Sequence, residues 1–231
     1  GSFKLDMSFF DFATGLTMTN SKFDNLFENK ARKPEEEINE FHMDIASSIQ
    51  EVTEEIMLKM TKSLRDEYQI KNLCLAGGVA LNCVANGKVN KKKIFENIWI
   101  QPAAGDAGGS LGAGLAFWYN ELNNTRIIDK KDKMKGSYLG PKFSDEEIKF
   151  QLNKSKAIYK KYKYEDMIKL VAKELSNEKA IGWFQGSMEF GPRALGARSI
   201  LADPRSENMQ KNLNLKVKFR ESFRPFAPAI L

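Results

Sequence analysis

A strand, a glycine pair and a helix follow one another in residues 72–86, and the same order recurs directly afterwards. This repeat limits the possible folds more than any other feature of the chain. Residues 72–76 form a short apolar run that ends at Gly77 and Gly78, and residues 79–86 predict the first turns of a helix. α/β proteins approach nucleotides in this way, because glycine backbone and a helix N-terminus can contact phosphate. One glycine pair alone is equally consistent with a tight turn.

The second occurrence strengthens the α/β prediction. A strand is expected over 94–100, a loop of small residues over 102–110, and an Ala/Gly-rich helix from Leu111 to about Leu122. Open α/β sheets bind ligands at the carboxyl ends of their strands, and Asp106 is the only carboxylate in this loop. The spacing favours a ligand or metal contact and a helix N-cap equally. A metal would need further ligands from elsewhere in the chain.

A long amphipathic helix is predicted from Pro34 to about Arg65. Pro34 precedes three glutamates, which is typical of a helix start, because acids there face the positive end of the helix dipole. Apolar residues then recur at steps of three and four, so we expect one buried stripe: Ile38, Phe41, Ile45, Ile49, Val52, Ile56 and Met60. The chain has a single histidine, His42, and without a second His or Cys it is expected to be a satisfied helix residue rather than a metal ligand.

A polar, lysine-rich segment separates two predicted domains, residues 1–135 and 136–231. In the second domain, Ser144 to Glu147 reads as a capping box that opens a helix. A further amphipathic helix is expected from Tyr164 to about Leu175, and it is followed by a strand over 179–184.

Four arginines in the second domain predict a site for a polyanionic small substrate. Arg193 and Arg198 lie in a loop with glycines and a proline, and Arg220 and Arg224 follow among aromatic residues. Planar guanidinium groups suit phosphate or carboxylate oxygens, and stiff backbone holds them in place. The alternative is ion pairing within the protein, for which the candidate partners are Glu189, Glu207 and Glu221.

Composition argues against nucleic-acid and membrane partners. The formal net charge is +6, but the lysines are spread along the chain and alternate with acids, whereas nucleic-acid binding needs clustered basic charge. No apolar run approaches the roughly 20 residues of a membrane span and no signal peptide is recognised, so we expect a cytoplasmic protein.

Cys74 and Cys83 are expected to be buried thiols rather than a disulfide. The Gly1-Ser2 start and the stop at Leu231, in a predicted strand, suggest a fragment.

Several longer motifs resemble those of the NodU/CmcH-type O-carbamoyltransferases. They are Leu73-Cys-Leu-Ala-Gly-Gly-Val-Ala-Leu-Asn-Cys-Val-Ala-Asn86, Ile98-Trp-Ile-Gln-Pro-Ala-Ala-Gly-Asp-Ala-Gly109, Trp183-Phe-Gln-Gly-Ser-Met-Glu-Phe-Gly-Pro-Arg-Ala-Leu-Gly196 and Phe223-Arg-Pro-Phe-Ala-Pro228. The resemblance covers nearly the whole chain in unbroken order, and it includes Gly15-Leu-Thr-Met-Thr-Asn20. This makes it far more specific than any single motif.

The resemblance implies a two-part enzyme. The first part would be Kae1-like, related to the actin, Hsp70 and sugar-kinase superfold, and the second would be YrdC-like. The second part would convert carbamoyl phosphate and ATP into carbamoyl adenylate with loss of pyrophosphate. The first would transfer the carbamoyl group, beside a bound iron, to a hydroxyl of a sugar, antibiotic or related acceptor. By motif, the adenylate would contact Gly77, Gly78, Val79 and Asn82, and Asp106 would be one iron ligand. Arginines and Mg²⁺ would neutralise the phosphates.

The resemblance also predicts what is missing. Family members carry two metal-binding histidines in an upstream segment, and His42 cannot replace both. The family chain continues past Leu231, so the YrdC-like fold would be incomplete and this piece alone inactive. Two other classes of function remain open, a sugar-kinase-type phosphotransferase and a non-catalytic nucleotide-binding or interaction module. The Glu-Phe-Gly-Pro-Arg segment ending at Arg193 argues against the kinase, because kinases of that superfold have no counterpart to it.

Overall fold

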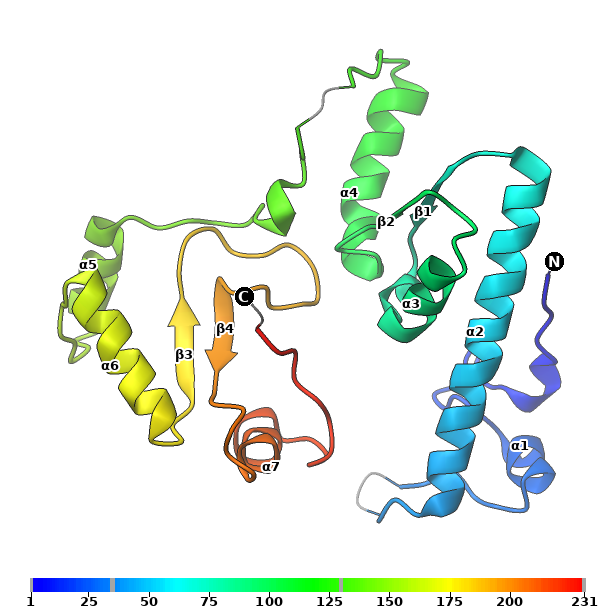
Figure 1. Cartoon of the computed structure of the whole chain (residues 1–231), viewed down its shortest axis with the longest axis horizontal. Coiled ribbons are helices and arrows are strands. Elements are labelled where there is room, and N and C mark those ends of the chain that lie inside the picture. Colours follow the sequence, from blue (N-terminus) through cyan, green and yellow to red (C-terminus); the bar gives the residue numbers. More distant parts are fainter. Residues whose placement is uncertain (1, 34–35, 129–130, 230–231) are drawn as a thin grey trace. The chain divides into compact units, whose positions relative to one another are not determined.

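The fold is that of a computed structural model, which describes residues 2–33, 36–128 and 131–229. The chain forms two compact units, residues 1–105 and 106–231 (Figure 1). Both combine helices with short strands, so the chain has the predicted mixed α/β character. None of the helices formed by these residues is long and apolar enough to cross a membrane.

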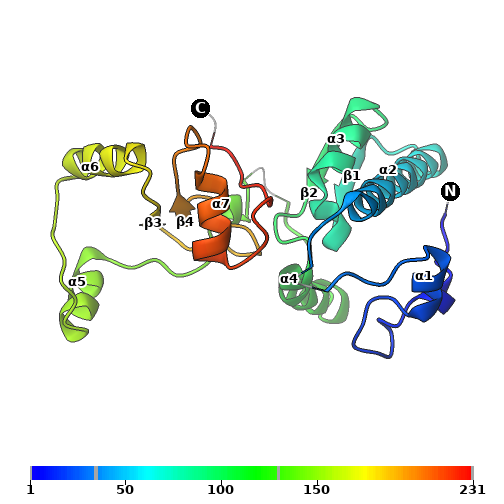
Figure 2. The same ribbon diagram turned by 90° about the horizontal axis from the view of Figure 1, so that it is seen from below.

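The first unit is built around one long helix and a pair of parallel strands. In chain order its elements are η1 (Met7–Phe9), α1 (Ser21–Leu26), α2 (Glu40–Tyr68), β1 (Asn72–Leu75), η2 (Gly78–Leu81), α3 (Cys83–Lys91) and β2 (Asn97–Ile100). Strands β1 and β2 pair in parallel with Leu73 opposite Ile98. Helix α3 packs against α2, as both views show (Figure 1, Figure 2). Between them lies a core of Met57, Leu73, Ala85, Val89 and Phe95.

Helix α2 begins later than the proline and glutamates predict. Asn39 is its N-cap, because the Asn39 side chain accepts from the His42 backbone N–H while His42 Nδ1 accepts from the Asn39 N–H. This reciprocal pair satisfies two backbone donors, which acidic residues ahead of a helix do not do. Pro34 lies outside the described residues, and the chain immediately before Asn39 is not helical. His42 is thus a satisfied helix residue, as predicted.

The predicted apolar stripe of α2 is only partly buried. Ile49, Val52 and Met60 are exposed, whereas Met57 and Thr61 are buried. Helix α3 packs on the α2 face that carries Met57, which shares the core with Ala85 and Val89 of α3. Spacing shows that a helix has an apolar side but does not show where its neighbour docks.

The prediction that both cysteines are buried is wrong. Cys74 and Cys83 are exposed free thiols. Successive residues of a strand face opposite sides, so Leu73 takes the core side of β1 and Cys74 the other. Cys83 opens α3 on its outer face.

Boundaries in the glycine and strand segments also shift. The expected helix over 79–86 is divided into the short η2 and the longer α3. Of the strand expected over 94–100, only Asn97–Ile100 is extended, while Phe95 turns into the core.

The second unit contains an antiparallel strand pair and a series of helical segments. Its elements are α4 (Asp106–Ala116), η3 (Phe117–Glu121), η4 (Lys135–Ser137), α5 (Asp145–Lys154), α6 (Tyr164–Ser176), β3 (Ile181–Phe184), β4 (Arg198–Leu201), α7 (Met209–Leu213) and η5 (Asn214–Lys218). The predicted capping box is present at Ser144 and Glu147. Strands β3 and β4 pair with Phe184 opposite Arg198, so the first arginine loop is their connection. The strand expected at the end of the chain is not formed over its described residues, up to Ala229.

Candidate functional sites

The glycine loop of the first unit joins β1 to α3 and is tied to the next loop. Gly77 has φ +98°, a conformation that favours glycine. Its N–H donates to Ala104 O at 2.7 Å, and the Gln101 N–H donates to Leu75 O at 3.1 Å. These bonds hold the loops that follow β1 and β2 together at the carboxyl edge of the pair, where α/β proteins bind ligands.

The first turn after Gly77 presents open backbone donors. Neither the Gly78 nor the Val79 N–H donates to another group in the described part of the chain. A Cβ at Gly78 would meet no atom within 4 Å, and the Val79 side chain is 59% exposed. Adjacent free N–H groups that face solvent can donate hydrogen bonds to an anion such as phosphate.

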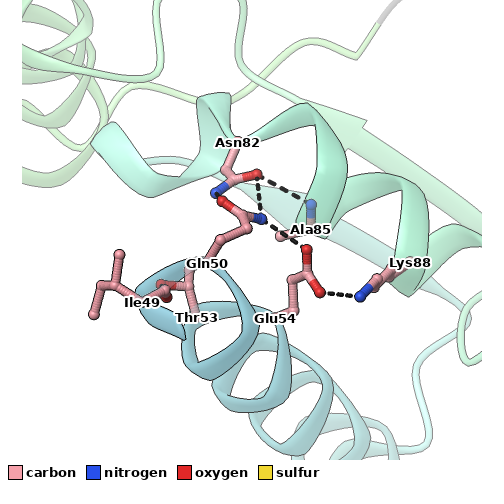
Figure 3. Close-up of polar contacts among 7 residues, drawn as sticks. All are labelled: Ile49, Gln50, Thr53, Glu54, Asn82, Ala85 and Lys88. Carbon is pink, nitrogen blue, oxygen red and sulfur yellow. Dashed lines mark hydrogen bonds and ion pairs between the residues drawn. The ribbon is translucent and has the colours of Figure 1, made fainter. Parts of the chain in front are cut away.

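Asn82 closes the loop and is held from two sides. It is the N-cap of α3, where its Oδ1 accepts from the Ala85 N–H at 3.1 Å. Its amide also lies against that of Gln50 on α2, with Nδ2 to Gln50 Oε1 at 2.8 Å and Gln50 Nε2 to Asn82 Oδ1 at 3.2 Å (Figure 3). The predicted ligand contact is therefore at least a structural anchor of the loop.

A buried carboxylate extends this contact. Glu54 is only 5% exposed; its Oε1 accepts from Gln50 Nε2 at 2.8 Å, and its Oε2 pairs with the Lys88 ammonium of α3. The hydrogen bonds from Gln50 and Lys88 lower the pKa of the Glu54 carboxyl, although burial opposes this. Sequence reasoning missed Gln50, Glu54 and Lys88, because nothing in the spacing links α2 to α3. The only signal in the sequence was the spacing of Gln50 and Glu54, two polar residues one helical turn apart beside the apolar stripe of α2.

In the second unit, Glu189 organises the β3–β4 loop. Its Oε1 accepts the backbone N–H groups of Leu195, Ala197 and Arg198 at 2.8, 2.7 and 3.2 Å. Burial raises the pKa of this carboxyl, but the backbone donors outweigh burial and lower it to about 2. No arginine side chain pairs with Glu189 among the described residues, so the predicted ion-pair alternative does not form here.

Arg198 is used to hold the loop. Its Nη1 donates to the carbonyls of Gln185 and Ala197 at 2.8 and 2.9 Å. Its Nη2 reaches the carbonyls of Pro141 and Gly186, each at 3.3 Å. The guanidinium carbon also lies 3.4 Å from the centroid of the Phe184 ring. Both terminal nitrogens of this side chain are therefore engaged by backbone oxygens.

Arg193 has the opposite environment. It is exposed, and its side chain makes no hydrogen bond or ion pair with another described residue. Gly191 and Gly196, with φ +123° and +104°, shape the backbone on either side. Of the two arginines in this loop, Arg193 therefore has the free donors.

Arg220 and Arg224 each have a protein partner. Arg220 Nε donates to Asn214 Oδ1 at 2.7 Å and its guanidinium lies 5.0 Å from the centre of the Phe226 ring. Arg224 pairs with Glu221 at 2.9 Å, which is the ion pair that the alternative interpretation predicted. No hydrogen bond, ion pair or ring contact between described residues joins these two arginines to the β3–β4 loop.

Asp106 lies inside the first turn of α4 rather than at its N-cap, and among the described residues no cluster of possible metal ligands includes it. It is the first residue of α4 and is exposed, and its carboxylate makes no hydrogen bond within the described chain. An acid in the first turn is favourable to the helix dipole. The described residues contain no group of three His, Cys, Asp or Glu that could hold a metal ion, so they do not fit an iron site by themselves.

Comparison with known proteins accounts for the combination of glycine loop and arginine loop. Residues 1–115 match the family model described as carbamoyltransferase N-terminus, and residues 172–231 match the model described as carbamoyltransferase C-terminus. The chain belongs to the carbamoyltransferase family. The two matches leave residues 116–171 between them.

Relatives of this carbamoyltransferase-family chain include nodulation proteins. The chain is 54% identical to uncharacterized protein sll1178 of Synechocystis, over all of this chain and 38% of that protein. It is 41% identical to nodulation protein NolO of Bradyrhizobium diazoefficiens, over 82% of this chain and 34% of that protein. It is 34% identical to nodulation protein U of Rhizobium fredii, over 70% of this chain and 25% of that protein. The chain thus spans roughly a third of the length of these relatives.

Proposed function

We propose that the chain is part of an O-carbamoyltransferase that activates a carbamoyl group with ATP and passes it to a hydroxyl. The observation that carries this proposal is the pair of matches to the N- and C-terminal carbamoyltransferase models, which together take in both candidate loops. The acceptor would be a sugar, an antibiotic or a related small molecule.

The proposed reaction has two steps. In the first, the carbamoyl group becomes attached to the α-phosphate of ATP as carbamoyl adenylate. Water takes up the phosphoryl group of carbamoyl phosphate, so that phosphate leaves and carbamate remains. A carbamate oxygen then bonds to the α-phosphorus of ATP, and the bond from this phosphorus to pyrophosphate breaks. In the second, the acceptor oxygen bonds to the carbamoyl carbon, AMP leaves, and the hydroxyl proton is lost.

The glycine loop is the proposed ATP contact. The open N–H groups of Gly78 and Val79 would donate to phosphate oxygens, while Gly77 provides the turn that lets the backbone approach. Asn82 would act chiefly as the anchor of the loop, since Gln50 and the α3 backbone already occupy its oxygen.

The arginine loop is the proposed site for a phosphorylated reactant. Arg193 would supply its free guanidinium to the anion, while Arg198 keeps the loop in shape. Arg220 and Arg224 would contribute positive charge, and Arg224 would exchange Glu221 for the substrate to do so. Reactants that carry several negative charges repel one another unless cations, including Mg²⁺, neutralise them.

Iron, which would supply Lewis-acid chemistry, is proposed with Asp106 as only one of its ligands. The described residues hold no cluster that could complete the set, so the other ligands would come from the rest of the protein.

The proposed architecture is a Kae1-like domain over residues 1–135 and a YrdC-like domain over 136–231. The parallel β1–β2 pair followed by glycine loops supports the first assignment, and the antiparallel β3–β4 pair is compatible with the second. Residues 106–135, which lie in the second compact unit, would belong to the first of these domains.

Pyrophosphate release by the full-length protein tests the function. We expect pyrophosphate only when ATP and carbamoyl phosphate are both present, and we expect neither reactant alone to give it. ATP hydrolysis at the same rate with and without carbamoyl phosphate would contradict the proposal and favour a kinase-type activity. Nucleotide binding without turnover under any condition would favour a non-catalytic module.

A further inference from the structure

We propose that Gln50 is a positioning residue of the ATP site, which acts by orienting the side-chain amide of Asn82. The inference rests on the proposed function, because it concerns the same loop. Gln50 lies on α2, far from the loop in sequence, and meets Asn82 through two amide–amide hydrogen bonds (Figure 3).

Two groups of fixed polarity set the direction of these bonds. At one end the Ala85 N–H can only donate, so the group facing it must be Asn82 Oδ1. At the other end the ionised Glu54 carboxylate can only accept, so the group facing it must be Gln50 Nε2. With both ends fixed, Gln50 Oε1 and Asn82 Nδ2 are brought together, and neither amide can flip without losing at least two bonds.

The anchor is needed because of where Asn82 lies. Its backbone N–H donates to Val79 O at 2.9 Å, so a shift of Asn82 moves the turn that carries the free Val79 donor. The Asn82 oxygen already has two donors, from Ala85 and Gln50. Asn82 can therefore fix the geometry of the phosphate-facing turn, and Gln50 fixes Asn82.

Lys88 and Glu54 keep the far end of the network charged. Glu54 is buried, and burial of an ionised carboxylate lowers the stability of the folded protein unless the charge is paired. Lys88 on α3 pairs with it, so the same ion pair that neutralises Glu54 also bridges the two helices. The network thus connects α2 with α3 at two places. Glu54 pairs with Lys88, and Gln50 contacts Asn82 at the N-terminus of α3.

The first test is Gln50→Leu in the full-length protein, assayed by pyrophosphate release. We expect the KM for ATP to rise about tenfold, as when one or two modest hydrogen bonds are lost, while the KM for carbamoyl phosphate stays within about twofold. The matched control is Thr53→Ala on the next turn of α2. The Thr53 hydroxyl donates to the Ile49 carbonyl of its own helix and lies outside the amide network, so we expect wild-type kinetics.

The second test reverses the polarity of the network. Gln50→Glu places a second carboxylate against Glu54 and removes the donor to Asn82, so we expect an ATP KM as high as that of Gln50→Leu. Adding Glu54→Gln lets the new amide at position 54 donate to the new carboxylate at position 50, which still accepts from Asn82. We expect only partial recovery, with an ATP KM between those of Gln50→Glu and wild type, because the repulsion between positions 50 and 54 is removed while the donor to Asn82 Oδ1 is still missing. A purely structural requirement for glutamine at position 50 would give no recovery.

The outcomes separate this inference from the proposed function. If the wild type shows the carbamoyl-phosphate-dependent reaction and both position-50 single variants keep its ATP KM, the inference is overturned and the function stands. If the wild type lacks the reaction, calorimetric titration with ATP decides. Weaker binding by Gln50→Leu than by wild type and Thr53→Ala supports the inference, and equal or absent binding overturns it.

Discussion

At the scale of single residues, Arg193 and Arg198 belong to one loop but have different surroundings, and we propose separate tasks for them. Four backbone carbonyls and an aromatic ring occupy Arg198, whereas Arg193 is exposed with free donors. The sequence predicts an arginine-rich loop but cannot divide these tasks, because one acceptor of Arg198 is the carbonyl of Pro141, which is remote in the chain.

This division predicts different outcomes for the two alanine variants. Arg193→Ala should weaken the carbamoyl-phosphate-dependent step by about 2 kcal/mol or more if the side chain binds phosphate, while changing folding stability by less than about 0.5 kcal/mol. Arg198→Ala should instead lower stability, because it leaves carbonyls without donors. Pyrophosphate kinetics and thermal unfolding of the full-length protein measure the two effects. Normal kinetics for Arg193→Ala would reassign this residue to structure or surface.

Gly77 and Gly78 also form a matched pair. A methyl group added to either glycine would meet no atom within 4 Å, but only Gly77 has a positive φ, +98°. Gly77→Ala should therefore cost about 1–2 kcal/mol of stability through backbone strain. Gly78→Ala should leave stability nearly unchanged and weaken ATP binding, because its methyl group would occupy the open surface. Chemical denaturation and calorimetric ATP titration would check both, and equal stability losses would contradict the assignment.

At the scale of elements, local signals predicted more than long-range ones. The capping box at Ser144 is present, and the order of strand, glycine loop and helix after residue 72 is as expected. The start of α2 was missed because the reciprocal Asn39–His42 cap is stronger than the signal from preceding acids. The buried face of α2 was predicted incorrectly in part, because it depends on where α3 packs.

The candidate sites follow the same rule. Their glycines and arginines were visible in the sequence, since the backbone requirements of turns and the chemistry of guanidinium groups are local properties. Gln50 and Glu54, which support the glycine loop, were not visible, because they contact α3 residues that are remote in the chain. Glu189 was expected only as an ion-pair partner, because its role depends on how the loop backbone folds around it.

At the scale of the whole molecule, acid stability should depend on Glu189. Its pKa is about 2 in the folded protein, below the ordinary value of 4.5, so its contribution is complete above about pH 4.5 and is lost as the pH falls towards 2. Glu189→Gln should reduce the loss of unfolding free energy between these pH values. Asp203, whose pKa is lowered to about 2 by hydrogen bonds from Arg205, titrates in the same window, so the slope should shrink rather than vanish.

Urea unfolding at several pH values measures this slope. Asp203→Asn is the comparison variant, because its carboxylate pairs with an exposed arginine instead of lying beneath a loop. An identical slope for wild type and Glu189→Gln would show that the buried carboxylate does not titrate on unfolding.

The carboxylate beneath the β3–β4 loop has one more consequence. Three amides of one loop that converge on a single point form the kind of concavity that captures free anions, and in this protein the chain's own glutamate fills it. A phosphate that binds at this loop could not use these three amides, because Glu189 already accepts from them. Flexible cationic side chains would have to bind it instead. Selectivity for the incoming reactant would then come from the reach and number of those side chains rather than from a rigid backbone cradle.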